Sequence, residues 1–139
     1  MNTPTSEIRT IIVERELPHA PEKIWRALTQ PHLMEEWLMK TAFEPEVGHR
    51  FKFSADWGEI QCEVIAIDLH RKLEYSWDAC DLKSVVSWEL TPTDKGTVRR
   101  MEQTGFKPDQ PRYYGGAKLG WPRFLDNLEQ VLKRMDQGN

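Results

Sequence analysis

The segment 119–135, near the C-terminus, has the clearest periodicity in the sequence. Its apolar residues recur three, four or seven positions apart, which is the spacing of one face of an α-helix. These residues are Trp121, Phe124, Leu125, Leu128, Val131, Leu132 and Met135. Charged and amide side chains fill the other positions, so the sequence predicts an amphipathic helix with one solvent-exposed face. Such a helix must bury its apolar face on a large surface, and only the strand-like segments before it offer one.

Most of the chain before this helix has the alternating pattern of half-buried β-strands. Apolar and polar residues alternate over residues 8–17, 50–55, 59–64, 72–77, 85–90 and 97–105. Turn sequences at 56–58 and 94–96 join consecutive strands. Short strands with tight turns predict an antiparallel sheet rather than a doubly wound parallel one.

Prolines divide the segment after the first strand into two short helices. Residues 21–29 place apolar side chains on one helical face, and Pro21 suits the first turn of a helix. Pro31 interrupts this pattern, and residues 31–38 then form a second short amphipathic segment. The predicted fold is therefore α+β, a curved antiparallel sheet against one long helix. At 139 residues we expect a single domain with an ordered core of about 8–135.

The region just before the C-terminal helix is less regular. Residues 107–116 are rich in proline, glycine and aromatic residues, which predicts a loop. Pro122 lies just inside the helical pattern, so either the helix begins there or an earlier turn is disturbed. Its missing N–H and its ring favour a kink or break near the mouth of any pocket between helix and sheet.

Composition argues against several classes of function. With 19 basic and 22 acidic residues the net charge is −3, and no basic block predicts nucleic-acid binding. No apolar run approaches the roughly 20 residues of a membrane span. The first residues lack the apolar stretch of a signal peptide, so we expect a cytoplasmic protein. Cys62 and Cys80 are then expected to be reduced thiols.

The sequence contains no recognisable metal, cofactor or catalytic motif. The four histidines, His19, His32, His49 and His70, are scattered and have no metal-ligand spacing. Nothing assembles a nucleophile, a base and an oxyanion site. We therefore expect no metal, no cofactor and no catalytic residue.

Several segments together resemble a known family. They are PEKIWRALTQPHLMEEWL, VGHRFKF, LEYSW, VSWELTPTDKGT and TGF, followed by GW and spaced leucines. This pattern resembles the family named for the activator of the heat-shock-protein-90 ATPase, within the START-related polyketide-cyclase and birch-pollen-allergen (SRPBCC) superfamily. The resemblance covers about residues 8–135. It implies the helix-grip fold, in which a curved sheet wraps around the long C-terminal helix. It also implies binding of hydrophobic or amphipathic molecules in many relatives, cyclase or hydrolase activity in some, and protein binding in others.

Two positions depart from the family pattern. Arg99 stands where the family usually has an apolar residue, and Cys62 replaces a common glycine. Arg15 and Arg99 both share a strand face with apolar neighbours, and an isolated buried charge is very costly. Each guanidinium therefore meets a protein carboxylate, reaches the rim, or binds the carboxylate or phenolate of a ligand.

Six tryptophans in 139 residues are compatible with an aromatic core or with an aromatic-walled cavity. Our main hypothesis is non-catalytic binding of a small hydrophobic or aromatic molecule, including an anionic one, between sheet and helix. The candidate ligand-binding residues are Trp37, Phe51, Phe53, Tyr75, Trp77, Trp88, Arg99, Met101, Gln103, Trp121, Phe124 and Leu128. The alternatives are a protein-binding module of the chaperone-regulator type, with a protein partner or a second copy of the chain, and a polyketide cyclase- or hydrolase-like enzyme.

Overall fold

The computed structural model of the chain describes residues 9–138. Seven strands form one antiparallel sheet in the order β1-β7-β6-β5-β4-β3-β2. The strands are β1 (Arg9–Leu17), β2 (Lys40–Thr41), β3 (Arg50–Ala55), β4 (Gly58–Asp68), β5 (Lys72–Ala79), β6 (Leu82–Thr93) and β7 (Gly96–Phe106). The helices are α1 (Pro21–Thr29), α2 (Pro31–Trp37) and α3 (Pro111–Gly138). The predicted α+β helix-grip architecture is confirmed.

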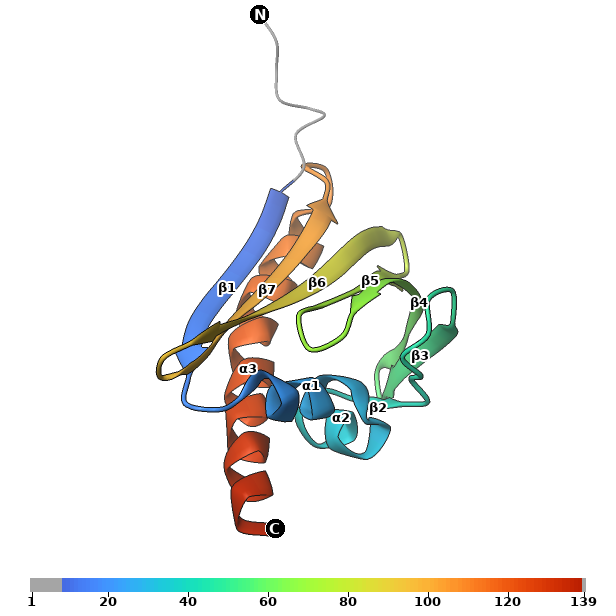
Figure 1. Cartoon of the computed structure of the whole chain (residues 1–139). Coiled ribbons are helices and arrows are strands. Elements are labelled where there is room, and N and C mark those ends of the chain that lie inside the picture. The colour runs from blue at the N-terminus through green and yellow to red at the C-terminus, as the bar shows by residue number, and fades with distance from the viewer. Residues whose placement is uncertain (1–8, 139) are drawn as a thin grey trace, which may run out of the picture.

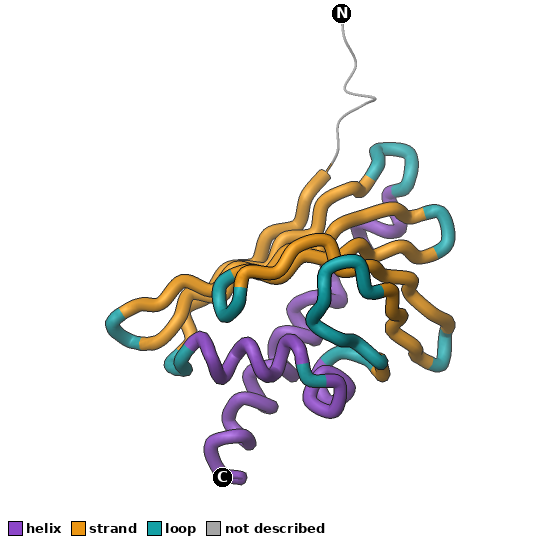
Figure 2. Tube along the Cα trace, turned by 45° about the vertical axis from the view of Figure 1, so that its right-hand side comes forward, coloured by secondary structure: helices purple, strands orange, loops and turns teal. Residues whose placement is uncertain are grey.

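The sheet curves over α3, and the three helices gather on one side of it (Figures 1 and 2). Strands β3 to β7 follow one another as a meander, because each is joined to the next by a short turn. α1 and α2 carry the chain from β1 at one edge of the sheet to β2 at the other. This connection places the two short helices against α3, with which both are in contact.

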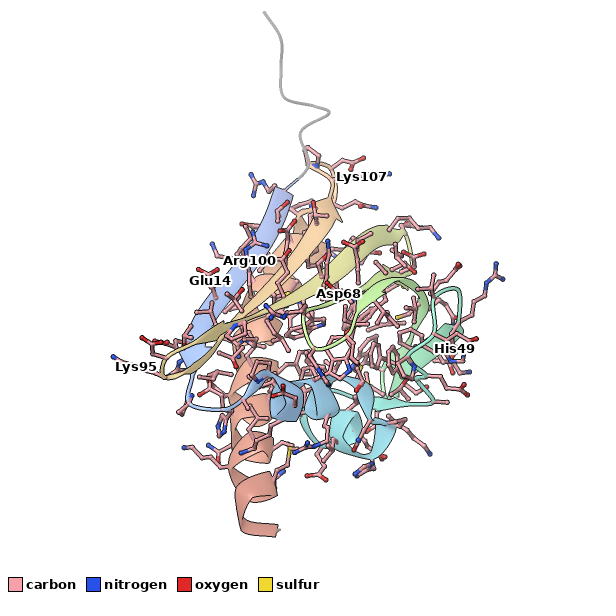
Figure 3. The ribbon with its side chains drawn as sticks, viewed as in Figure 1. Glu14, His49, Asp68, Lys95, Arg100 and Lys107 are labelled. Carbon is pink, nitrogen blue, oxygen red and sulfur yellow. The ribbon has the colours of Figure 1, made fainter. Side chains whose placement is uncertain are left out.

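The alternation read from the sequence is the alternation of burial in the strands. On β7 the side chains at 97, 99, 101 and 103 are buried, and those between them are half-buried. On the outer side, Glu14 of β1 pairs in register with Arg100 of β7, and both are labelled in Figure 3. The Arg100 guanidinium lies 2.7 Å from the Glu102 carboxylate and 4.0 Å from that of Glu14. The outer face is therefore charged and the inner face carries the core.

Two predictions about the C-terminal region are wrong. Residues 111–116 are not a loop, because they form the first turns of α3. The helix neither begins at Pro122 nor breaks there, since α3 continues through it to Gly138, and a kink at this proline stays a prediction. Trp121 and Leu125, on either side of this proline, are 2% and 3% exposed. Burial of this apolar face holds the segment helical although the proline removes one backbone hydrogen bond.

None of the helices within residues 9–138 is long and apolar enough to span a bilayer.

Candidate ligand-binding cavity

An interlocked cluster of aromatic rings fills the interior between α2, the sheet and α3. Trp88 lies between Trp37 and Trp121, with ring centroids 5.7 Å and 5.8 Å away and nearly perpendicular planes. The Trp37 indole N–H donates to the carbonyl of Ala27 at 2.8 Å, and the Trp88 indole N–H donates to the Tyr75 hydroxyl at 3.1 Å. Both indole N–H groups therefore have hydrogen-bond acceptors inside the protein, and this region is a closed core.

A cavity of about 390 Å³ lies beside this core, under the first half of α3. Its lining residues come from α3, from β4 to β6 with their turns, from β7 and from the segment before β2. They are Met39, Trp57, Ile60, Trp77, Ala79, Cys80, Leu82, Gln103, Arg112, Tyr113, Gly116, Ala117, Gly120, Trp121 and Phe124. The lining is mainly apolar and aromatic, which is typical of pockets for small organic molecules.

A hydrogen-bonded chain fixes the inner wall of the cavity. The Trp121 indole N–H donates to the Gln103 side-chain oxygen at 2.6 Å, and the Gln103 amide nitrogen donates to the Ser84 hydroxyl at 3.0 Å. That hydroxyl donates in turn to the Trp77 carbonyl at 2.6 Å. Each polar group in this chain therefore has a partner, and the Trp121 indole is held as a rigid wall against the backbone of β5.

The outer end of the cavity is formed by the start of α3 and two turns of the sheet. The Tyr113 hydroxyl accepts a hydrogen bond from the Asp81 backbone N–H at 3.3 Å, which ties α3 to the β5–β6 turn. Trp57, in the β3–β4 turn, is 67% exposed although it lines the cavity. Arg112 is exposed and contributes the charged side chain of the lining.

Arg99 and Arg15 meet the same carboxylate, away from this cavity. Arg15, whose side chain is 60% exposed, donates to Glu129 at 2.9 Å. Arg99 is 1% exposed, and its Nη1 lies 4.0 Å from the same carboxylate. Burial lowers the pKa of Arg99, and the Glu129 charge opposes this. The Glu129 carboxylate thus forms an ion pair with both guanidinium groups, but Nε and Nη1 of Arg99 are buried without a hydrogen-bond partner among the described residues. Arg99 does not line the cavity.

The predicted binding residues divide into two groups. Trp77, Gln103, Trp121 and Phe124 line the cavity. The others do not line it and are buried in the packed interior. They are Trp37, Phe51, Phe53, Tyr75, Trp88, Arg99, Met101 and Leu128.

Sequence reasoning missed the lining residues from the first turns of α3. Tyr113, Ala117 and Trp121 are spaced by four, so the helical period extends back through the segment predicted to be a loop. The prolines and glycines around them obscured that signal. The β3–β4 and β5–β6 turns, with Trp57 and Cys80, carried no pattern that points to a shared site.

A second hollow, of about 490 Å³, lies at the β2–β3 edge of the sheet. Its lining includes Lys40, Phe51 and two cations that already have partners on the neighbouring strand. Arg50 lies 3.5 Å from Glu63, and Lys52 lies 2.9 Å from Glu59. We favour the cavity under α3 as the binding site because its wall is apolar and aromatic. Within residues 9–138 no group of His, Cys, Asp and Glu could hold a metal ion.

Solved structures with this fold are numerous. The structure of protein MLL2253 from Mesorhizobium loti is 59% identical, has a TM-score of 0.88, and matches over 91% of this chain and 98% of that one. CalU16 from Micromonospora echinospora is 21% identical with a TM-score of 0.78, over 94% of this chain and 80% of its own. DynU16, from the dynemicin biosynthetic locus, is 20% identical with a TM-score of 0.79, over 89% of this chain and 47% of its own. The last two similarities establish the fold alone.

No curated protein is significantly similar to this chain. The family described as "Activator of Hsp90 ATPase homolog 1-like protein" matches residues 18–133, which is most of the length. The chain therefore belongs to the family of activator of Hsp90 ATPase homolog 1-like proteins.

Proposed function

We propose that this protein binds a small apolar or aromatic molecule in the cavity under α3, without transforming it. The observation that carries the proposal is an apolar cavity of about 390 Å³ between the helix and the sheet. This volume falls in the lower part of the roughly 300–1,000 Å³ found for small-molecule pockets. It suits a ligand with one or two rings.

The arrangement of titratable groups favours binding over catalysis. Burial raises the pKa of the Cys62 thiol and of the Tyr75 hydroxyl, and neither group lines the cavity. The polar groups of the inner wall are held by one another, from Trp121 through Gln103 to Ser84. Such a wall can position a ligand, but it offers no evident acid–base pair for catalysis.

The test uses two neighbouring glycines of α3. Gly116 lines the cavity and Gly115 does not, and an added Cβ meets nothing within 4 Å at either position. Gly116→Leu should fill the cavity, whereas Gly115→Leu should leave it open. Both changes favour helix, so both variants should fold.

The binding measurement is a fluorescence titration with the neutral probe N-phenyl-1-naphthylamine. We expect Gly116→Leu to weaken binding by about tenfold or more, and Gly115→Leu to stay within about twofold of the parent. Equal binding by both variants would place the probe outside the cavity. If the parent protein binds no member of an aromatic library and carries no small molecule in native mass spectrometry, the protein-binding activity suggested by the family's description becomes the better hypothesis.

A further inference from the structure

The cavity wall is mainly apolar, and Arg112 is its one charged residue. Arg112 is the second residue of α3 and is exposed. In the part of the chain that the structure describes, no carboxylate forms an ion pair with it.

Three other arginines on or against α3 already have partners. Arg134 lies 2.8 Å from Glu36, and Arg15 lies 2.9 Å from Glu129. Arg9 lies over the Tyr114 ring, with its guanidinium carbon 5.1 Å from the centroid. Within residues 9–138 the Arg112 guanidinium has no such contact, so its donors are available to a ligand.

The remaining polar groups of the lining leave few alternatives for recognition. Gln103 is held by Trp121 and Ser84, and the Tyr113 hydroxyl already accepts from the Asp81 backbone. The carboxylates nearest in sequence to the lining turns, Asp56 and Asp81, are not part of the lining. A ligand acid beside Arg112 would therefore meet a cation and no lining carboxylate.

We infer that the natural ligand is an aromatic anion, whose ring lies against Trp77 and Trp121 and whose acidic group pairs with Arg112. This rests on the proposed function, and it adds the chemical class of the ligand. A guanidinium binds a carboxylate, sulfonate or phenolate by charge-assisted hydrogen bonds, which are roughly twice as strong as neutral ones. Because the wall is otherwise apolar, a charge elsewhere on the ligand would lose its hydration without compensation.

The test compares two probes that share a phenyl-naphthylamine body. One is 8-anilino-1-naphthalenesulfonate, which is an anion, and the other is the neutral N-phenyl-1-naphthylamine. Arg112→Leu should weaken the sulfonate probe by about tenfold and the neutral probe by less than about twofold. Arg112→Lys should keep part of the preference for the sulfonate probe, since lysine retains the positive charge but lacks the planar guanidinium that forms two parallel hydrogen bonds. Added salt should weaken only the sulfonate probe in the parent protein.

Arg123→Leu is the matched control, because Arg123 lies on α3, is exposed and does not line the cavity. It should leave both titrations unchanged. Equal effects of Arg112→Leu on the two probes, or none on either, would overturn the inference while leaving cavity binding intact. Failure of both probes to bind the parent, or binding unaffected by Gly116→Leu, would instead refute the proposed function.

Discussion

The Trp121 indole donates a hydrogen bond of 2.6 Å to the side-chain oxygen of Gln103, and this bond joins the middle of α3 to β7. Gln103 is 1% exposed and Trp121 is 2% exposed, so water cannot replace the bond if it is lost. The same pair stands between the closed aromatic core and the cavity. It therefore bears on both stability and binding.

Gln103→Leu should lower the free energy of unfolding by about 2–3 kcal/mol, because the Trp121 N–H is left buried without an acceptor and Ser84 loses a donor. Urea unfolding, followed by circular dichroism, measures the change. Gln61→Leu is the control, since Gln61 is exposed on β4 and should change stability by no more than about 0.5 kcal/mol. Similar losses in the two variants would contradict the structural role of the Gln103 bond.

Glu129→Gln should destabilise the protein by about 2 kcal/mol, because it leaves the Arg99 charge buried without a carboxylate. The expected loss is less than that for a fully enclosed pair, since the Glu129 side chain is 20% exposed and lies 4.0 Å from Arg99. Adding Arg99→Met to this variant should restore most of the stability. Glu36→Gln, which breaks the exposed pair with Arg134, should cost less than about 1 kcal/mol. No recovery in the double variant would show that the charge of Arg99 is not what Glu129 balances.

Gly115→Ala should raise the free energy of unfolding by about 0.5–1 kcal/mol, because alanine favours helix and its Cβ meets nothing within 4 Å. Gly105→Ala should have the opposite effect. Gly105 has a φ of 123°, and a Cβ there would lie 2.5 Å from the Lys83 carbonyl oxygen. Thermal unfolding of both variants tests the pair. A loss of stability in Gly115→Ala would mean that α3 is distorted at its first turns.

Stability should fall in alkaline solution, starting at about pH 9. Burial raises the pKa of Cys62 above its ordinary 9.0 and that of Tyr75 above its ordinary 10.0. Above these ordinary pKa values the unfolded state releases the two protons while the folded state still keeps them. The folded state is therefore fully stable below pH 9, and its free energy of unfolding falls as the pH rises above that value. Each group should lower the free energy of unfolding by about 1.4 kcal/mol per pH unit between its ordinary and its raised pKa.

Urea unfolding between pH 7 and pH 11 measures this slope. It should become shallower in a Cys62→Ala, Tyr75→Phe double variant. Cys80→Ala is the control, because Cys80 is exposed and its removal should leave the slope unchanged. A slope that is the same in all variants would assign the alkaline loss to other groups.

The fold could be predicted from the sequence because strand and helix periods are local and strong. Pro21 and Pro31 set the starts of α1 and α2, and alternation set the inner face of β7. The start of α3 was predicted wrongly, because proline and glycine between 107 and 120 weigh against helix in isolation. Burial of the Tyr113, Ala117 and Trp121 face outweighs this weak local preference.

The candidate site could be predicted only in part, because inward-facing residues look alike in a sequence. Trp77 and Trp88 both alternate inward on neighbouring strands, yet only Trp77 lines the cavity. Trp88 is covered by Trp37, which α2 brings from a distant part of the chain. Arg99 stood out in the sequence, yet it is buried 4.0 Å from Glu129 and away from the cavity, whereas no sequence pattern marked the exposed Arg112.

The two halves of α3 have different roles. Its second half, with Leu128, Val131 and Leu132 fully enclosed, holds the protein together. Its first half forms one wall of the cavity and contains positions such as Gly116 where a larger side chain would fit. Substitutions in these early turns would therefore reshape the cavity while leaving intact the segment that secures the fold.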